Sequence, residues 1–108
     1  MSIDLNEVYA VLLESVFKAP DSSVDKEDLA QEATGANDEL ARDIELFCQA
    51  FSDFKKTVEM GDVEQQQLSL VVVRARAMGI ETVFRNLAKT VEDVVAALNK
   101  RKGDEGRF

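Results

Sequence analysis

The stretch LARDIELFCQAFSDFKKTV, residues 40–58, decides the fold class of this chain. Its large apolar residues recur at alternating steps of four and three, which places them on one side of a helix and is typical of a buried helix seam. These residues are Leu40, Ile44, Phe47, Phe51, Phe54 and Val58. We therefore expect a helix here, with Asn37 as its N-cap and with Met60 and Gly61 at its end.

The same spacing continues through residues 63–100, where Asp62 with Gln65 marks a helix start and the rhythm survives passage through Gly79. The residues that keep it are Leu70, Val73, Ala77, Ile80, Phe84, Leu87, Val91, Val94 and Leu98. As one helix this segment spans roughly 57 Å, about twice the diameter of a small domain. Either the helix breaks at Gly79 and folds back as a helix pair, or it is unbroken and its far half meets another chain.

The first 36 residues predict two shorter helices. Asp4 with Glu7 opens the first, over about residues 4–18, and Pro20 ends it because proline has no N–H to donate. Its apolar face consists of Leu5, Tyr9, Leu12 and Val16. The second runs over about residues 25–34, with Gly35 as its C-terminal cap. Together the segments predict an all-α fold, a compact helical bundle of four to five helices with a long C-terminal helix or helix pair.

The length of 108 residues suits one hydrophobic core. We expect a single helical domain over residues 1–103, ended by Gly103, and a flexible tail over residues 104–108. No apolar run approaches the roughly 18 to 20 residues of a membrane span, and the first residues do not resemble a signal peptide. Cys48 is the only cysteine, so it forms no internal disulfide. These features favour a cytoplasmic protein without a membrane partner.

Charge is divided unevenly along this acidic chain, whose net charge is −8. Residues 1–64 hold 16 acidic and 5 basic side chains, net −11, whereas residues 65–108 hold 5 acidic and 8 basic side chains, net +3. This imbalance indicates a solvated acidic face or an acidic surface for a basic partner. Direct binding of nucleic acid is disfavoured, because that affinity depends on Lys and Arg contacts with phosphates.

The residues that catalysis most often requires are missing from the sequence. There is no histidine, so neither a Ser-His nor a Cys-His nucleophile is available, and no phosphate-binding glycine loop is present. We expect Cys48 to be a small structural residue, buried or half-buried. We predict no catalytic residues, no metal ligands and no cofactor. An all-helical Mg²⁺-dependent nucleotide pyrophosphohydrolase is a remote alternative, with Glu32, Glu39 and Asp43 as the nearest carboxylates.

Residues 29–44 also follow the outline of a helix-turn-helix around Gly35. The helix that would enter the DNA groove carries Asp38, Glu39, Asp43 and Glu45 around a lone Arg42, so phosphates would repel it. The outline is better explained by two helices that pack at an angle. An alternative function follows, in which the acidic helix mimics DNA and inhibits a DNA-binding protein.

The plan of segments resembles the TyeA-type regulators of type III secretion, small helical proteins that bind the gatekeeper controlling export. The resemblance covers roughly the first 80 residues. It is carried by Ile3-Asp4-Leu5-Asn6-Glu7, by Asp25-Lys26-Glu27-Asp28-Leu29-Ala30, by the aromatic residues between Phe47 and Phe54, and by Glu64-Gln65-Gln66-Gln67-Leu68. It implies a cytoplasmic protein that binds another secretion component and has no enzyme activity.

The sequence supplies more apolar surface than one small core needs. The leading hypothesis is therefore a non-enzymatic interaction protein, an adaptor, chaperone or regulator, that binds a protein partner or a second copy of itself. We expect the following residues to form the partner-binding face: Ile80, Phe84, Leu87, Val91, Val94 and Leu98.

Overall fold

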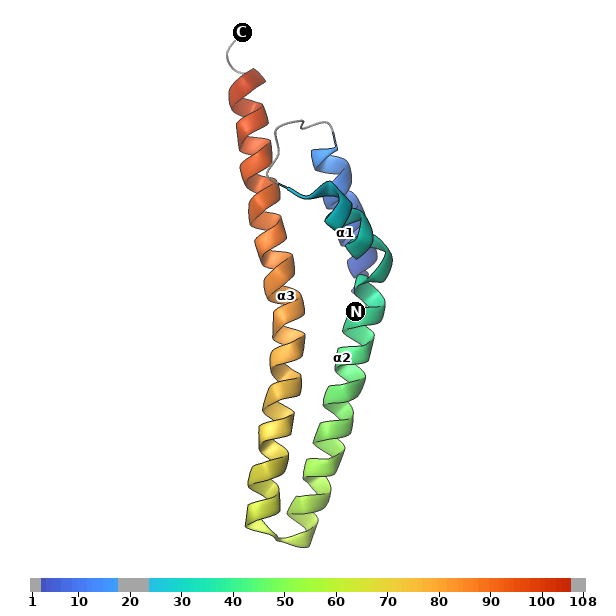
Figure 1. Ribbon diagram of the computed structural model, residues 1–108, viewed down its shortest axis with the longest axis vertical. Coiled ribbons are helices and arrows are strands. Elements are labelled where there is room, and N and C mark those ends of the chain that lie inside the picture. The colour runs from blue at the N-terminus through green and yellow to red at the C-terminus, as the bar shows by residue number, and fades with distance from the viewer. Residues whose placement is uncertain (1–2, 18–23, 106–108) are drawn as a thin grey trace. The chain divides into compact units, whose positions relative to one another are not determined.

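A computed structural model describes residues 3–17 and 24–105 of the chain. Over these residues it contains three helices, α1 (Leu5–Val16), α2 (Lys26–Met60) and α3 (Val63–Glu105), and no strand (Figure 1). The prediction of an all-α fold is confirmed. The prediction of four to five helices is wrong, because residues 26–60 form one helix and residues 63–105 form another.

The chain divides into two compact units. Unit 1 combines Met1–Asn37 with Asn86–Phe108, and unit 2 is Asp38–Arg85. Unit 2 is a hairpin of two helical arms: arm one is the part of α2 from Asp38 to Met60, and arm two is the part of α3 from Val63 to Arg85. The expectation of a single domain over residues 1–103 stays a prediction, and residues 106–108 of the expected tail lie outside the described residues.

Helix α2 passes through Gly35 and Asn37, where the sequence predicted one helix to end and the next to begin. The apolar residues Leu29, Ala36 and Leu40 keep the same helical phase across this point, and they are 2%, 2% and 8% exposed. Breaking the helix would turn some of these side chains out of their packing, whereas a glycine within a helix costs only about 1 kcal/mol. The continuous helix also removes the turn that the helix-turn-helix outline required.

Asn37 is not the N-cap of α2, but its side chain caps a different helix. Its Oδ1 accepts hydrogen bonds from the backbone N–H groups of Leu5 (2.6 Å) and Asn6 (3.3 Å), two of the unpaired donors in the first turn of α1. In return, the Asn37 backbone N–H donates to Oδ1 of Asn6 at 3.0 Å. The start of α1 is therefore fixed against α2 within unit 1 (Figure 1).

Asp4 completes this cap as the N-cap residue of α1. Its Oδ1 accepts the backbone N–H of Glu7 at 3.0 Å and the Nδ2–H of Asn37 at 2.9 Å. The hydrogen bond from Asn37 and then the one from Glu7 hold the pKa of the Asp4 carboxyl below its usual value, because both favour the charged form. The predicted helix start is confirmed, and Pro20 with residues 21–23 lies outside the described residues.

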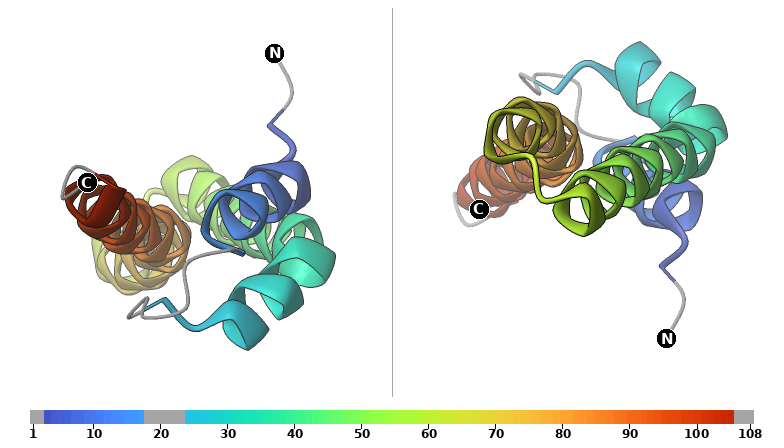
Figure 2. Two further views of the ribbon diagram at one scale, coloured as in Figure 1. Left: turned by 90° about the horizontal axis from the view of Figure 1, so that it is seen from above. Right: turned by 90° about the horizontal axis from the view of Figure 1, so that it is seen from below.

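The turn between the arms is built around Gly61, which has φ +73° and therefore occupies the left-handed region that glycine favours. Its N–H donates to the carbonyl groups of Thr57 and Val58, both at 3.1 Å, and so closes α2. Oδ1 of Asp62 accepts the N–H of Gln65 at 3.2 Å and opens α3. Both predicted helix boundaries are confirmed here. The two arms stand side by side above this turn in Figure 1 and recede from it side by side in the right-hand view of Figure 2, which is seen from below.

Helix α3 is unbroken through Gly79, so the sequence's alternative of a helix pair is not adopted. Val73 and Ile80 are half-buried and Val83 is 8% exposed, which shows that one buried stripe continues on both sides of the glycine. Gly103, expected to end the helix, also lies within α3. Tertiary packing of the stripe offsets the low helix propensity of Gly79.

The buried residues are distributed unequally between the units. The described core of unit 1 draws on all three helices and consists of Leu5, Tyr9, Val16, Val24, Leu29, Ala36, Val94 and Ala97. In unit 2 only Leu40, Ala50 and Val83 fall in the buried class among the described residues. Two helices alone can cover only one side of each other, so much of the apolar surface of the hairpin faces water.

Candidate protein-binding surface

The apolar seam of arm one divides into two columns, each with a spacing of seven residues. Leu40 is 8% exposed, and Phe47 and Phe54 are half-buried, so this inner column closes the hairpin. The outer column follows the inner column by four residues, so it lies beside the inner column on the helix surface, and it is exposed to water. It consists of Ile44, Phe51 and Val58, which are 45%, 47% and 49% exposed.

Arm two divides in the same way. Its inner column contains the half-buried residues Val73 and Ile80. Its outer column consists of Val63, Leu70, Ala77 and Phe84, all exposed, with exposed fractions of 46% for Leu70 and 38% for Phe84. On each arm the outer column is displaced by four residues from the inner column, that is, in the same rotational sense about the helix axis.

The two outer columns lie on the same side of the hairpin. The arms run in opposite directions, and on two antiparallel helices that face each other, an equal rotation about each axis leads to the same side. Residues at equal distances from the Gly61 turn are level, so side chains from the two arms alternate along this side. We call these seven residues the hairpin face; in order from the turn they are Val63, Val58, Leu70, Phe51, Ala77, Ile44 and Phe84.

The opposite side of the hairpin is mixed in character. Its corresponding columns are Glu39, Leu46 and Asp53 on arm one and Gln65, Val72 and Gly79 on arm two. Further exposed apolar residues, Leu68, Val71 and Met78, lie on arm two alone. The hairpin face is thus the side on which both arms contribute an unbroken apolar column, as a helical bundle requires at each of its interfaces.

The six residues predicted to bind a partner occupy two different positions on α3. Ile80 and Leu87 are half-buried and Val94 is 3% exposed, so these three point into their own units. Phe84, Val91 and Leu98 point outward and are 38%, 39% and 38% exposed. That these residues bind a partner stays a prediction.

The outer residues of arm one, together with Leu70, were not among the residues that the sequence predicted to bind a partner. Ile44, Phe51 and Val58 carried the rhythm that identified the helix, and all were expected to be core. The sequence carried no local signal for this, because two columns that alternate by three and four residues can both face a single neighbouring helix, as the a and d columns of a coiled coil do.

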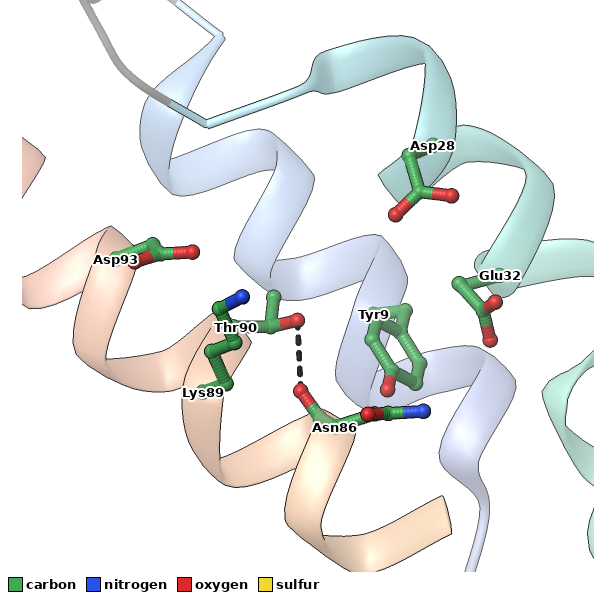
Figure 3. A pocket seen from close by; sticks show the side chains of 7 residues that line it. All are labelled: Tyr9, Asp28, Glu32, Asn86, Lys89, Thr90 and Asp93. Atoms are coloured by element: carbon green, nitrogen blue, oxygen red, sulfur yellow. Dashed lines mark hydrogen bonds between the residues drawn. The ribbon is translucent and has the colours of Figure 1, made fainter. Parts of the chain in front are cut away.

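Unit 1 contains a hollow with a volume of about 360 Å³ (Figure 3). Its lining is contributed by all three helices and consists of Tyr9, Asp28, Glu32, Asn86, Lys89, Thr90 and Asp93. Thr90 donates its hydroxyl hydrogen to the carbonyl of Asn86 at 3.0 Å. Pockets that bind small molecules are mainly apolar with a few polar groups, and this lining has the reverse composition. The hollow therefore fits water better than an organic ligand.

The described residues contain no group of three or more His, Cys, Asp or Glu side chains that could hold a metal ion. Glu32, Glu39 and Asp43, the carboxylates of the Mg²⁺ alternative, are accordingly not assembled into a site. Cys48 is a free and exposed thiol, so the expectation that it is buried or half-buried is wrong. Within residues 3–17 and 24–105, no helix is both long and apolar enough to span a membrane.

Comparison of the chain with known protein families, with curated proteins and with solved structures finds no match.

Proposed function

We propose that this chain is a non-enzymatic protein–protein interaction module that binds another protein, or a second copy of itself, through apolar helix faces. The observation that supports this proposal is the hairpin face, where arm one and arm two both expose large apolar side chains by between 38% and 66%. Burial of such side chains is the main favourable term in protein association. The resemblance to TyeA-type regulators suggests one class of partner, a secretion gatekeeper.

The proposal predicts that a charge on the hairpin face prevents binding, whereas the same charge on the opposite side is tolerated. Phe84→Lys changes the hairpin face, and Leu46→Lys is its matched control, because Phe84 and Leu46 are 38% and 37% exposed. Immobilised wild-type chain and both variants are incubated with extract of the native cells. The proteins that remain bound, including untagged copies of this chain, are then identified by mass spectrometry.

We expect the wild-type chain and Leu46→Lys to retain the same protein and Phe84→Lys to lose it, with all three giving equal helical circular dichroism. Retention of that protein by all three chains, or by none, would overturn the proposal. Circular dichroism separates loss of binding from loss of folding, because a variant that merely unfolds loses its helical signal.

A further inference from the structure

The structure offers a specific occupant for the hairpin face. We propose that it binds a second copy of this chain, with arm one of each copy packed against arm two of the other and with both Gly61 turns at the same end. This inference rests on the proposed function and names its partner.

The hairpin face is self-complementary in its geometry. The hairpin face is one line of side chains taken alternately from the two arms. A two-fold axis that runs along this face, parallel to the long axis of the hairpin, places the same face of a second copy against it. The outer column of arm one in each copy then meets the outer column of arm two in the other copy, at the same distance from the turn. The result is a four-helix arrangement in which every neighbouring pair of helices is antiparallel.

The sizes of the side chains along the hairpin face support this alignment of the two copies. Ala77 is the one small residue on the hairpin face, and it lies level with the space between Ile44 and Phe51. In the paired arrangement, Phe51 of one copy approaches Ala77 and Leu70 of the other. A large side chain thus meets a gap beside a small one, as knobs-into-holes packing requires.

The net charges of the two arms favour the same pairing. Arm one holds six acidic and three basic side chains, net −3, whereas arm two holds two acidic and three basic side chains, net +1. Arg74 and Arg76, at the middle of arm two, form no ion pair with any residue that the structure describes. Glu39 and Asp53 lie on the opposite side of the hairpin, so the effect is one of net charge and not of ion pairs across the face: arms of opposite net charge attract each other, and two copies of arm one would repel each other. Only the orientation with both turns at one end pairs unlike arms.

The size of the hairpin face is that of a small interface. The face extends over 15 residues of arm one, from Ile44 to Val58, and over 22 residues of arm two, from Val63 to Phe84, or roughly 21 and 32 Å. With each helix about 10 Å wide, the projected area is on the order of 500 Å² per copy, near the roughly 600 Å² per partner at which stable interfaces begin. The face is therefore comparable in size to the smallest stable interfaces.

The test uses the purified full chain, whose monomer mass is 12.0 kDa. Sedimentation velocity and light scattering from micromolar concentration to about 100 µM should give twice that mass for the wild type. Leu70→Lys should raise the dimer dissociation constant by about tenfold or more, and Val72→Lys, at an equally exposed residue on the opposite side, should leave it unchanged. Equal helical circular dichroism for the three proteins excludes unfolding as the cause.

Orientation is measured separately, with a nitroxide at residue 60 in the variant Met60→Cys, Cys48→Ala. If the turns lie at the same end, the distance between the two labels is below about 25 Å, and if they lie at opposite ends it is above about 30 Å. A long distance overturns the proposed pairing of unlike arms.

The remaining outcomes separate this inference from the proposed function. A wild-type chain that stays at 12.0 kDa yet captures a different protein through Phe84 overturns the second copy and leaves the proposed function standing. A chain that stays monomeric and captures nothing overturns both.

Discussion

Replacing Asn37 by alanine tests whether a side chain in the middle of α2 holds the start of α1 in place. The substitution removes the acceptor of the Leu5 and Asn6 N–H groups and the donor to the Asp4 carboxylate. Loss of a helix cap costs about 1 kcal/mol, and a buried donor left without a partner costs roughly 1 to 3 kcal/mol, two effects that overlap here. Alanine returns about 0.5 kcal/mol through its higher helix propensity. We expect a net loss of about 1 to 2 kcal/mol.

The natural fluorophore of the chain makes this measurement local. Tyr9 is the only tyrosine, there is no tryptophan, and Tyr9 lies on α1 with 3% of its surface exposed. Tyrosine emission during urea unfolding therefore follows α1, whereas circular dichroism mainly follows α2 and α3, which hold most of the helical residues described. In Asn37→Ala the fluorescence transition should move to lower urea and separate from the dichroism transition.

The matched control is Asn99→Ala, the same chemical change at an exposed position of α3. It should raise stability by about 0.5 kcal/mol and keep the two transitions together. If Asn37→Ala shifts both transitions upward as Asn99→Ala does, the hydrogen bonds of Asn37 do not hold α1 and the reasoning is refuted.

Two further predictions concern the cap and the glycines. Because the pKa of Asp4 is lowered in the folded protein, its ionised form stabilises the fold at pH values above the usual carboxyl range. This contribution disappears as the pH falls through the folded-state pKa, so the difference in stability between wild type and Asp4→Asn should shrink on acidification. A difference that is independent of pH between neutral and strongly acidic solution would contradict this. Gly79→Ala should stabilise the protein by about 1 kcal/mol, because an added Cβ at Gly79 meets nothing within 4 Å and alanine has the higher helix propensity. Gly61→Ala should destabilise the protein by about 1 kcal/mol, because φ is +73° at Gly61. Thermal melts that rank the two variants in the opposite order would refute the comparison.

Local patterns in the sequence were sufficient to predict the all-helical class, the start of α1 and the turn between the arms. The spacing of Leu40 to Val58 identified a helix, Asp4 with Glu7 marked a start, and Gly61 with Asp62 marked a boundary. Each of these signals arises within one or two helical turns, so it does not depend on the rest of the fold.

The errors occurred where tertiary contacts outweigh local preference. Gly35 and Asn37 have the chemistry of helix ends, yet α2 continues because Leu29 and Ala36 pack in phase within unit 1. Asn37 was predicted as the N-cap of the helix that follows it, but its side chain caps α1, where the donors Leu5 and Asn6 lie 32 and 31 residues away, and no local rule identifies such a partner. The hairpin face was missed for a related reason: which column of a seam becomes exposed depends on how many helices surround it.

The division of the chain into units has a consequence for the order of synthesis. Unit 2 is a hairpin closed by neighbouring segments, whereas unit 1 joins residues near the start of the chain to residues from Asn86 onward. The ribosome completes the hairpin before it makes Val94 and Ala97, which belong to the core of unit 1. Short-range helical contacts also form faster than contacts between distant parts of a chain. A nascent chain therefore forms the exposed apolar hairpin face first, and α1 has to wait for the later residues before its own surroundings are complete.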